Sequence, residues 1–189
     1  MASTRDHILD TTCDLLEKQG YHATGLNQIV EESGAPKGSL YYYFPDGKEG
    51  LTAEAIERAG AAVRERIRAS LAEIEDAPEA VRSFILTVAG HVEASGWRAG
   101  GPITTVAMET ATSSERLSEA CRQAYQSWVA AFEEKLLLNH YPPQTAAPLA
   151  TLIIASMEGA IVLSRTYRST APLQHIAAEL HRLLVLSKG

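Results

Sequence analysis

The chain has 189 residues, of which 46% are hydrophobic and 21% are charged, and its formal net charge is −6. This composition is that of an ordinary soluble globular protein of one or two domains, long enough to bury a core without disulfides or metals. The acidic balance excludes a protein that binds nucleic acid through a generally basic surface, and the first fifty residues hold only four Lys and Arg against eight Asp and Glu.

No feature of the sequence predicts export or membrane insertion. The first ten residues, MASTRDHILD, are polar where a signal peptide needs an apolar segment. The longest apolar-rich run, LATLIIASMEGAIVLS, contains Glu158 and is short for a membrane span. Cys13 and Cys121 lie far apart in apolar, helix-like surroundings, as reduced core thiols do. We therefore expect a soluble, cytoplasmic protein without a membrane partner.

Apolar residues recur at intervals of three and four almost throughout, so the sequence predicts an all-α fold of about nine helices. The first helix is predicted at Thr4–Gln19, with Ser3 and Asp6 as a capping box at its start. Its buried stripe consists of Ile8, Leu9, Thr12, Cys13, Leu15 and Leu16. Gly20 is placed to end this helix in a left-handed conformation.

Two short helices are predicted next. The segment TGLNQIVEESG begins with Thr24 as a candidate N-cap and ends at Gly34. A third helix opens at Pro36, which the first turn tolerates because the N–H that proline lacks would have no partner there. A supporting helix followed by two short helices joined by a tight glycine turn is the helix-turn-helix pattern.

After the turn FPDGKEG the elements become longer. We expect helices over about residues 48–76, 78–92, 103–112, 114–138, 144–167 and 172–187, with a glycine-rich break, GWRAGGP, before the third of these. The predicted domains are therefore a helix-turn-helix domain at residues 1–50 and a C-terminal regulatory domain at residues 51–189.

The residues that could carry catalysis or bind metal lack the required spacing. None of the six histidines, His7, His22, His91, His140, His175 and His181, forms an i, i+4 pair with another. No serine lies in a nucleophile elbow, and GWRAGGP has no P-loop lysine. We expect no enzyme, no metal site and no cofactor.

The third predicted helix has an unusual outer face. Leu40 and Phe44 are four residues apart and share the face that packs on the first two helices. The outer arc then carries Lys37, Gly38, Ser39, Tyr41, Tyr42 and Tyr43. Tyrosines often cover a core and keep their hydroxyls in water, which accounts for one or two of them.

Binding in a groove of DNA would explain every residue on the outer face of the third predicted helix. Tyrosine and serine hydroxyls, and that of Thr24, can donate to phosphate oxygens without adding net charge. Gly38 allows close approach to a base edge, and Lys37 can reach guanine acceptors.

The stretch ILDTTCDLLEKQGYHATGLNQIVEESGAPKGSLYYYFPDGKEGL resembles the DNA-binding domain of the TetR family of regulators, and the resemblance covers almost all of residues 4–56. It is carried by the GY-x-x-T-x-x-x-x-I core, the glycine turn, the segment KGSLYYYF and Lys48. The glycine in PDGKEG and the C-terminal pattern resemble the LmrA/YxaF-like branch. The segment SMEGAIVLSRTYRSTAPLQHIAAELHRLL resembles the last two helices of this family, which build its dimer.

The resemblance implies an all-helical homodimer with an N-terminal helix-turn-helix domain and a C-terminal ligand-binding and dimerisation domain. By position, Lys37, Gly38 and Ser39 would face bases, and Tyr41, Tyr42 and Tyr43 would contact phosphates or bases. Thr24 and Lys48 would hold the DNA backbone.

Dimerisation is also expected from the last two helices, which are apolar on more than one face, so the surplus face needs a partner. The predicted interface residues are Leu149, Ile153, Met157, Ile161, Ile176, Leu180, Leu183 and Leu184. A two-fold dimer would place two recognition helices on palindromic double-stranded DNA.

The candidate lining of a ligand pocket is Trp97, Met108, Trp128, Phe132 and Met157, with His91, Thr105 and Glu109 as polar groups. Each of these is equally compatible with ordinary core. The sequence thus predicts a repressor released by a lipophilic or aromatic small-molecule inducer. The alternative is a DNA-binding dimer without a small-molecule effector.

Overall fold

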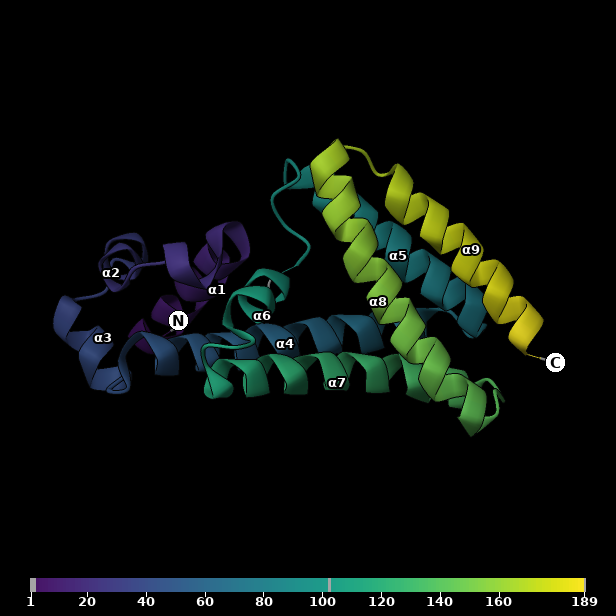
Figure 1. The fold of residues 1–189 in the computed structure, drawn as a ribbon, viewed down its shortest axis with the longest axis horizontal. Helices are drawn as coiled ribbons and strands as arrows, with labels where there is room; N and C mark the ends of the chain where they lie inside the picture. The colour runs from purple at the N-terminus through teal and green to yellow at the C-terminus, as the bar shows by residue number, and fades with distance from the viewer. Residues whose placement is uncertain (1–2, 102, 189) are drawn as a thin grey trace. The chain divides into compact units, whose positions relative to one another are not determined.

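The computed structural model describes residues 3–101 and 103–188, and within these residues it contains nine helices and no strand (Figure 1). The helices are α1 (Thr4–Ala23), α2 (Leu26–Ser33), α3 (Lys37–Tyr43), α4 (Gly47–Glu73), α5 (Ala77–Ala94), α6 (Thr104–Thr110), α7 (Glu115–Leu138), α8 (Pro143–Tyr167) and α9 (Ala171–Ser187). The predicted all-α fold of about nine helices is confirmed.

The described residues form two compact units. Unit 1 contains those up to Ala61 together with those of the segment Gly101–Ala124, and unit 2 contains those of Ala62–Gly100 and from Tyr125 onward. Helices α4 and α7 therefore each begin in unit 1 and continue in unit 2. The predicted domain boundary at residue 50 remains a prediction.

Helix α1 begins as the sequence predicts. The Ser3 side chain accepts a hydrogen bond from the Asp6 N–H, and the Asp6 carboxylate accepts one from the Ser3 N–H. The helix ends less simply than expected. Gly20 has φ 77° and ψ −175°, a conformation that is almost exclusive to glycine, and one further turn follows to Ala23. Gly20 has a positive φ, but its ψ lies outside the left-handed helical region and α1 continues to Ala23, so the prediction that it ends the helix in a left-handed conformation is wrong.

Helix α2 is capped differently from the prediction. Its N-cap is Gly25, so the expectation of Thr24 as N-cap is wrong. The Thr24 hydroxyl instead donates to the Gly20 carbonyl oxygen at 2.6 Å, and its backbone N–H donates to the Tyr21 oxygen at 3.2 Å. Gly34 ends α2 with φ 66°, as predicted, because an L side chain would be strained there.

Helix α3 is a single short helix anchored by two apolar side chains. Pro36 is its N-cap and Phe44 its C-cap. Leu40 and Phe44 are buried, as their spacing of four predicts. These contacts fix the rotation of α3 about its own axis and thereby decide which of its residues face outward.

Unit 2 is built around the packing of α5 against α8 and α9. Its buried side chains include Phe84, Ile85, Trp128, Phe132, Ile153 and Leu184. The buried Tyr141 donates its hydroxyl to the Leu184 carbonyl oxygen at 2.8 Å. Helix α8 is long and apolar enough to cross a membrane by length and composition, but 44% of its most apolar 18-residue window is buried inside the protein. One such helix is weak evidence of a membrane span, because a core helix passes the same test of length and composition.

Candidate nucleic-acid interface

The outer surface of α3 is aromatic and exposed. Tyr41, Tyr42 and Tyr43 are 51%, 79% and 36% exposed, whereas Leu40 and Phe44 on the opposite side are at most 1% exposed. The rings of Tyr42 and Tyr43 meet edge to face with their centroids 5.1 Å apart. Three tyrosines in succession are thus exposed on this surface of α3, and Tyr42 most of all.

Gly38 lies beside these tyrosines on the exposed part of α3. A Cβ added at this position would meet no atom within 4 Å, and the residue has no positive φ that would require glycine. Glycine inside a helix costs about 1 kcal/mol relative to alanine. Nothing in the fold therefore requires the absence of a side chain at Gly38, and the open space suits close approach by a ligand.

The remaining predicted DNA contacts differ in exposure. Lys37 is exposed and Ser39 is half-buried, both at the start of α3. Lys48 is half-buried, with its ammonium nitrogen 4.3 Å from the centroid of the Tyr21 ring. Burial lowers the pKa of Lys48, and the Glu109 carboxylate opposes this. Thr24 is buried, and its hydroxyl proton is used within the protein.

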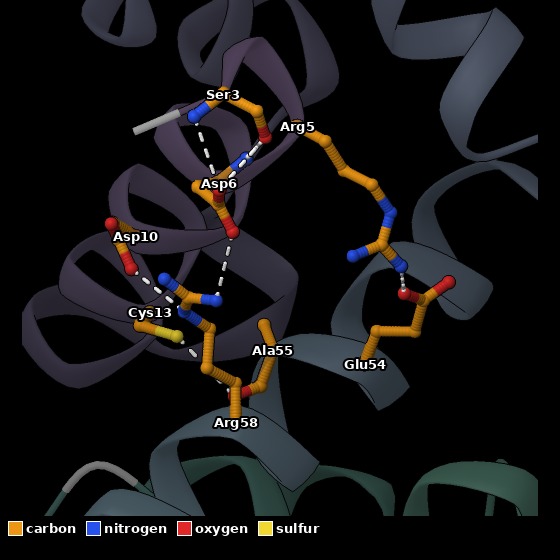
Figure 2. A network of polar contacts seen from close by, with 8 residues as sticks. All are labelled: Ser3, Arg5, Asp6, Asp10, Cys13, Glu54, Ala55 and Arg58. Atoms are coloured by element: carbon orange, nitrogen blue, oxygen red, sulfur yellow. Dashed lines mark hydrogen bonds and ion pairs between the residues drawn. The ribbon is translucent and has the colours of Figure 1, made fainter. Parts of the chain in front are cut away.

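A polar network fixes α1 to the first part of α4 (Figure 2). The Arg58 guanidinium donates to Asp10 at 2.8 Å and to Asp6 at 3.1 Å. Hydrogen bonds from Ser3 are the main reason that the pKa of Asp6 is lowered, and Arg58 adds to the effect. The Cys13 thiol donates to the Ala55 carbonyl oxygen at 3.2 Å, and burial raises its pKa to about 12.

Arg5 connects α4 to Phe44, the C-cap of α3. Its guanidinium pairs with Glu54 on α4 (Figure 2). The same guanidinium lies 5.3 Å from the centroid of the Phe44 ring. Exposed ion pairs contribute roughly 0–1 kcal/mol each. The network therefore serves mainly to orient α1, α3 and α4 relative to one another, an effect that sequence periodicity does not reveal.

Acidic residues close to α3 in sequence are engaged by the start of α7 and by the residue before it. The Arg116 guanidinium donates to Asp46 at 2.8 Å, and the Ser114 hydroxyl donates to Glu49. The segments of unit 1 nevertheless hold seven Lys and Arg against thirteen Asp and Glu, so they carry the entire net charge of −6. A DNA-binding surface in this unit must rely on local geometry and neutral donors.

Glu109 on α6 has partners that the sequence did not suggest. Its Oε2 accepts hydrogen bonds from the backbone N–H groups of Tyr21 at 2.6 Å and His22 at 3.0 Å. The residue was predicted as a polar group of a ligand pocket. Its neighbours on α6 are the half-buried Thr105 and Met108, which is 80% exposed.

The other predicted ligand residues lie in unit 2. Trp128, Phe132 and Met157 are buried, whereas Trp97 is half-buried with φ 66° and His91 is exposed. The rings form two edge-to-face pairs, Phe84 with Phe132 at 5.7 Å and Tyr125 with Trp128 at 5.0 Å between centroids. The interior of this unit is thus rich in aromatic surface.

The residues predicted for dimerisation lie mostly inside unit 2. Leu149, Ile153, Met157, Ile161, Leu180 and Leu184 are buried, Ile176 is half-buried and Leu183 is partly exposed. The exposed apolar side chains on α8 and α9 share only Leu183 with the predicted set, and they are Leu152, Val162, Leu163, Tyr167, Leu183, Val185 and Leu186. Periodicity identified two apolar faces but not which of them packs within the chain.

Two family models match the chain. The model described as "Bacterial regulatory proteins, tetR family" matches residues 8–55, which include α2 and α3. The model described as "Transcriptional regulator LmrA/YxaF-like, C-terminal domain" matches residues 77–179.

Similar proteins cover the whole chain. The uncharacterized HTH-type transcriptional regulator YxaF of Bacillus subtilis (strain 168) is 44% identical over 98% of this chain and 97% of its own length. The HTH-type transcriptional regulator LmrA of the same strain is 39% identical over 96% of each chain.

Solved structures share the fold. The reduced form of Escherichia coli NemR superposes with a TM-score of 0.84 at 23% identity, covering 94% of this chain and 96% of NemR. A TetR transcriptional regulator from Chloroflexus aurantiacus superposes with a TM-score of 0.83 at 28% identity, covering 96% of this chain and 94% of its own.

Proposed function

Because the chain belongs to the TetR family of bacterial transcriptional regulators, in its LmrA/YxaF-like branch, we propose that it represses transcription by binding a palindromic DNA operator as a homodimer. Its site of action is then the cytoplasm. The observation that carries the proposal is the outer face of α3, where three exposed tyrosines adjoin a glycine that the fold does not need.

In the bound state α3 lies in the major groove of the operator. Lys37, Gly38 and Ser39 face base edges, where a lysine can contact the guanine O6 and N7 acceptors. The hydroxyls of Tyr41, Tyr42 and Tyr43 donate to phosphates or bases. These neutral donors bind the DNA backbone without the basic surface that unit 1 lacks.

Lys48 and Thr24 support the same contact in different ways. Lys48 supplies a cation to a phosphate by turning from the Tyr21 ring, over which its ammonium lies in the free protein. Thr24 supports the interface without touching DNA. Its buried hydroxyl donates to the Gly20 carbonyl oxygen, and this hydrogen bond fixes the start of α2.

The homodimer forms through the exposed apolar side chains of α8 and α9. On α8, Leu152, Leu163 and Tyr167 recur at helical spacing, and Gly159 between them has open space around its Cα. An apolar stripe of this kind is covered in stable assemblies. Of the residues predicted from the sequence, Leu183 and Ile176 belong to this surface, and the buried ones support it from inside.

The inducer is a lipophilic or aromatic small molecule bound within unit 2. The aromatic side chains Trp128 and Phe132, with Met157, supply the lining, and Trp97 and His91 lie nearer the surface. A ligand bound there lowers operator affinity only if it prefers the conformation that cannot dock both α3 helices. Thr105, Met108 and Glu109 remain predicted lining residues, and the Glu109 carboxylate already accepts hydrogen bonds from the backbone of Tyr21 and His22.

The test is a gel shift with the DNA upstream of the protein's own gene, with and without aromatic and lipophilic compounds. We expect sequence-specific retardation that survives excess nonspecific DNA and that an active compound reverses. Failure to prefer any sequence would overturn the DNA-binding proposal. Specific binding that no ligand of unit 2 alters would favour the second candidate, a DNA-binding dimer without a small-molecule effector.

A further inference from the structure

The last turn of α1, directly after the non-helical Gly20, contains a backbone site for an anion, and the chain's own Glu109 occupies it. The consecutive N–H groups of Tyr21 and His22 converge on one carboxylate oxygen, Oε2, at 2.6 and 3.0 Å. Successive N–H groups arranged in this way form a concavity that binds anions. Hydrogen bonds to an ionised carboxylate are also stronger than those between neutral groups.

Gly20 shapes this site in two ways. Its φ of 77° with ψ −175° turns the chain so that the next two N–H groups point to the same side. A Cβ on Gly20 would lie 2.5 Å from Glu109 Oε1, 2.9 Å from Oε2 and 2.7 Å from the Thr105 methyl carbon. The carboxylate therefore fits against a surface that only glycine leaves open.

The same few residues hold the start of the helix-turn-helix segment. The Gly20 carbonyl accepts from the Thr24 hydroxyl, and the Tyr21 carbonyl accepts from the Thr24 N–H. The Lys48 ammonium lies over the Tyr21 ring in a cation–π contact. Glu109 is thus bonded directly to the backbone of the last turn of α1, which leads into the two helices that approach DNA.

We propose that Glu109 is a positioning residue for DNA binding, whose carboxylate fixes the Gly20–Thr24 turn and thereby sets α2 and α3 in the arrangement that fits the operator. This inference rests on the proposed function. The two can fail separately. Operator binding by the wild-type protein tests the proposed function, and operator binding by the Glu109 variants tests the positioning role.

Charge and hydrogen bonding can be separated at this residue. Glu109→Ala removes the acceptor and the negative charge, whereas Glu109→Gln removes the charge and keeps one neutral acceptor oxygen. Loss of a negative charge near Lys48 favours phosphate binding by itself. Weaker operator binding by Glu109→Ala than by Glu109→Gln therefore comes from the lost backbone hydrogen bonds.

The experiment measures operator affinity by fluorescence anisotropy for the wild type, Glu109→Ala, Glu109→Gln and the control Glu115→Ala, an exposed glutamate at the start of α7. We expect affinity about tenfold lower for Glu109→Ala, a smaller loss for Glu109→Gln, and no change for the control. Added formate should restore binding by Glu109→Ala, whereas chloride at equal ionic strength should not.

Wild-type-like binding by Glu109→Ala would overturn the proposal. So would weakened binding by folded Glu109→Ala that formate does not restore, since a merely structural cavity gives that result. If Glu109→Ala does not fold, the test uses Glu109→Gln instead. Hydrogen exchange of its backbone amides is then measured by NMR beside its operator affinity. Faster exchange of the Tyr21 and His22 amides together with reduced affinity supports the role, and unchanged affinity despite faster exchange contradicts it.

Discussion

Gly38 is the residue at which stability and function are expected to conflict. An alanine there would meet no atom within 4 Å and would improve helix propensity. We therefore expect Gly38→Ala to raise the free energy of unfolding by roughly 0.5–1 kcal/mol and to reduce operator affinity at least tenfold, because the methyl group blocks approach to the base edge. Chemical denaturation and anisotropy measure the two effects. Lower stability together with unchanged affinity would contradict this role.

Tyr42 is the most exposed of the three tyrosines, and its ring and hydroxyl can be tested separately. Tyr42→Ala should abolish tight operator binding while the dimer persists. Tyr42→Phe keeps the ring contact with Tyr43 and removes only the hydroxyl donor, so it should cost about 0.5–1.5 kcal/mol of binding free energy. If Tyr42→Ala and the wild type bind the operator with equal affinity, Tyr42 does not contact the DNA.

At the scale of the helix, α8 has two apolar faces with different roles. Ile153 is buried within unit 2, whereas Leu163 is 44% exposed. We expect Leu163→Glu to convert the dimer to a monomer with little loss of monomer stability, since a charge in an apolar interface lacks a partner. The matched control is Leu137→Glu on α7, a leucine of similar exposure. Light scattering after size exclusion gives the mass. If the Leu163→Glu variant is still a dimer, the exposed face of α8 is not the dimer interface.

The buried face of α8 should respond in the opposite way. Ile153→Ala leaves a cavity in unit 2 and should cost roughly 2–5 kcal/mol of stability in thermal or chemical unfolding. The folded fraction of Ile153→Ala should remain dimeric. A folded monomer would instead place Ile153 at the interface, as its sequence position first suggested.

For the whole molecule, the distribution of charge decides how salt affects DNA binding. Unit 1 carries the full net charge of −6, and the proposed interface offers Lys37 and Lys48 from each protomer. With about four phosphates neutralised by lysine, log Kobs should fall against log salt with a slope of about −4 or shallower. Lys48→Ala should flatten this slope by about one for each protomer, whereas the exposed Lys18→Ala should not change it. A steep slope near −8 would indicate a basic surface elsewhere.

Local rules predicted much of this molecule from the sequence. The Ser3 capping box, the positive φ at Gly20 and Gly34, and the burial of Leu40 and Phe44 all follow from contacts within a few residues. The outward face of α3 follows from the same spacing. Hydrophobic periodicity predicted the all-α fold class, which the structure confirms. Family resemblance then identified the regulator family, which the comparisons confirm.

Contacts between distant segments could not be predicted in this way. Glu109 binds backbone 87 and 88 residues away, and Arg58 reaches Asp6 across 52 residues, yet neither pairing follows from helical periodicity. Thr24 was expected to cap α2, but the Gly20 carbonyl behind it takes the hydroxyl. On α8, periodicity described both apolar faces equally well, and only packing against α5 and α9 distinguishes them.

Selection of DNA sequences from a random duplex library by the full-length protein tests the central claim most directly. The wild type should enrich a palindrome whose two half-sites are separated by about one helical turn or more, because a two-fold dimer presents two α3 helices. Tyr42→Ala, which leaves the dimer intact, should enrich no sequence. Enrichment of the same palindrome by both proteins, or of none by the wild type, would contradict the assignment of α3 as the surface that reads DNA.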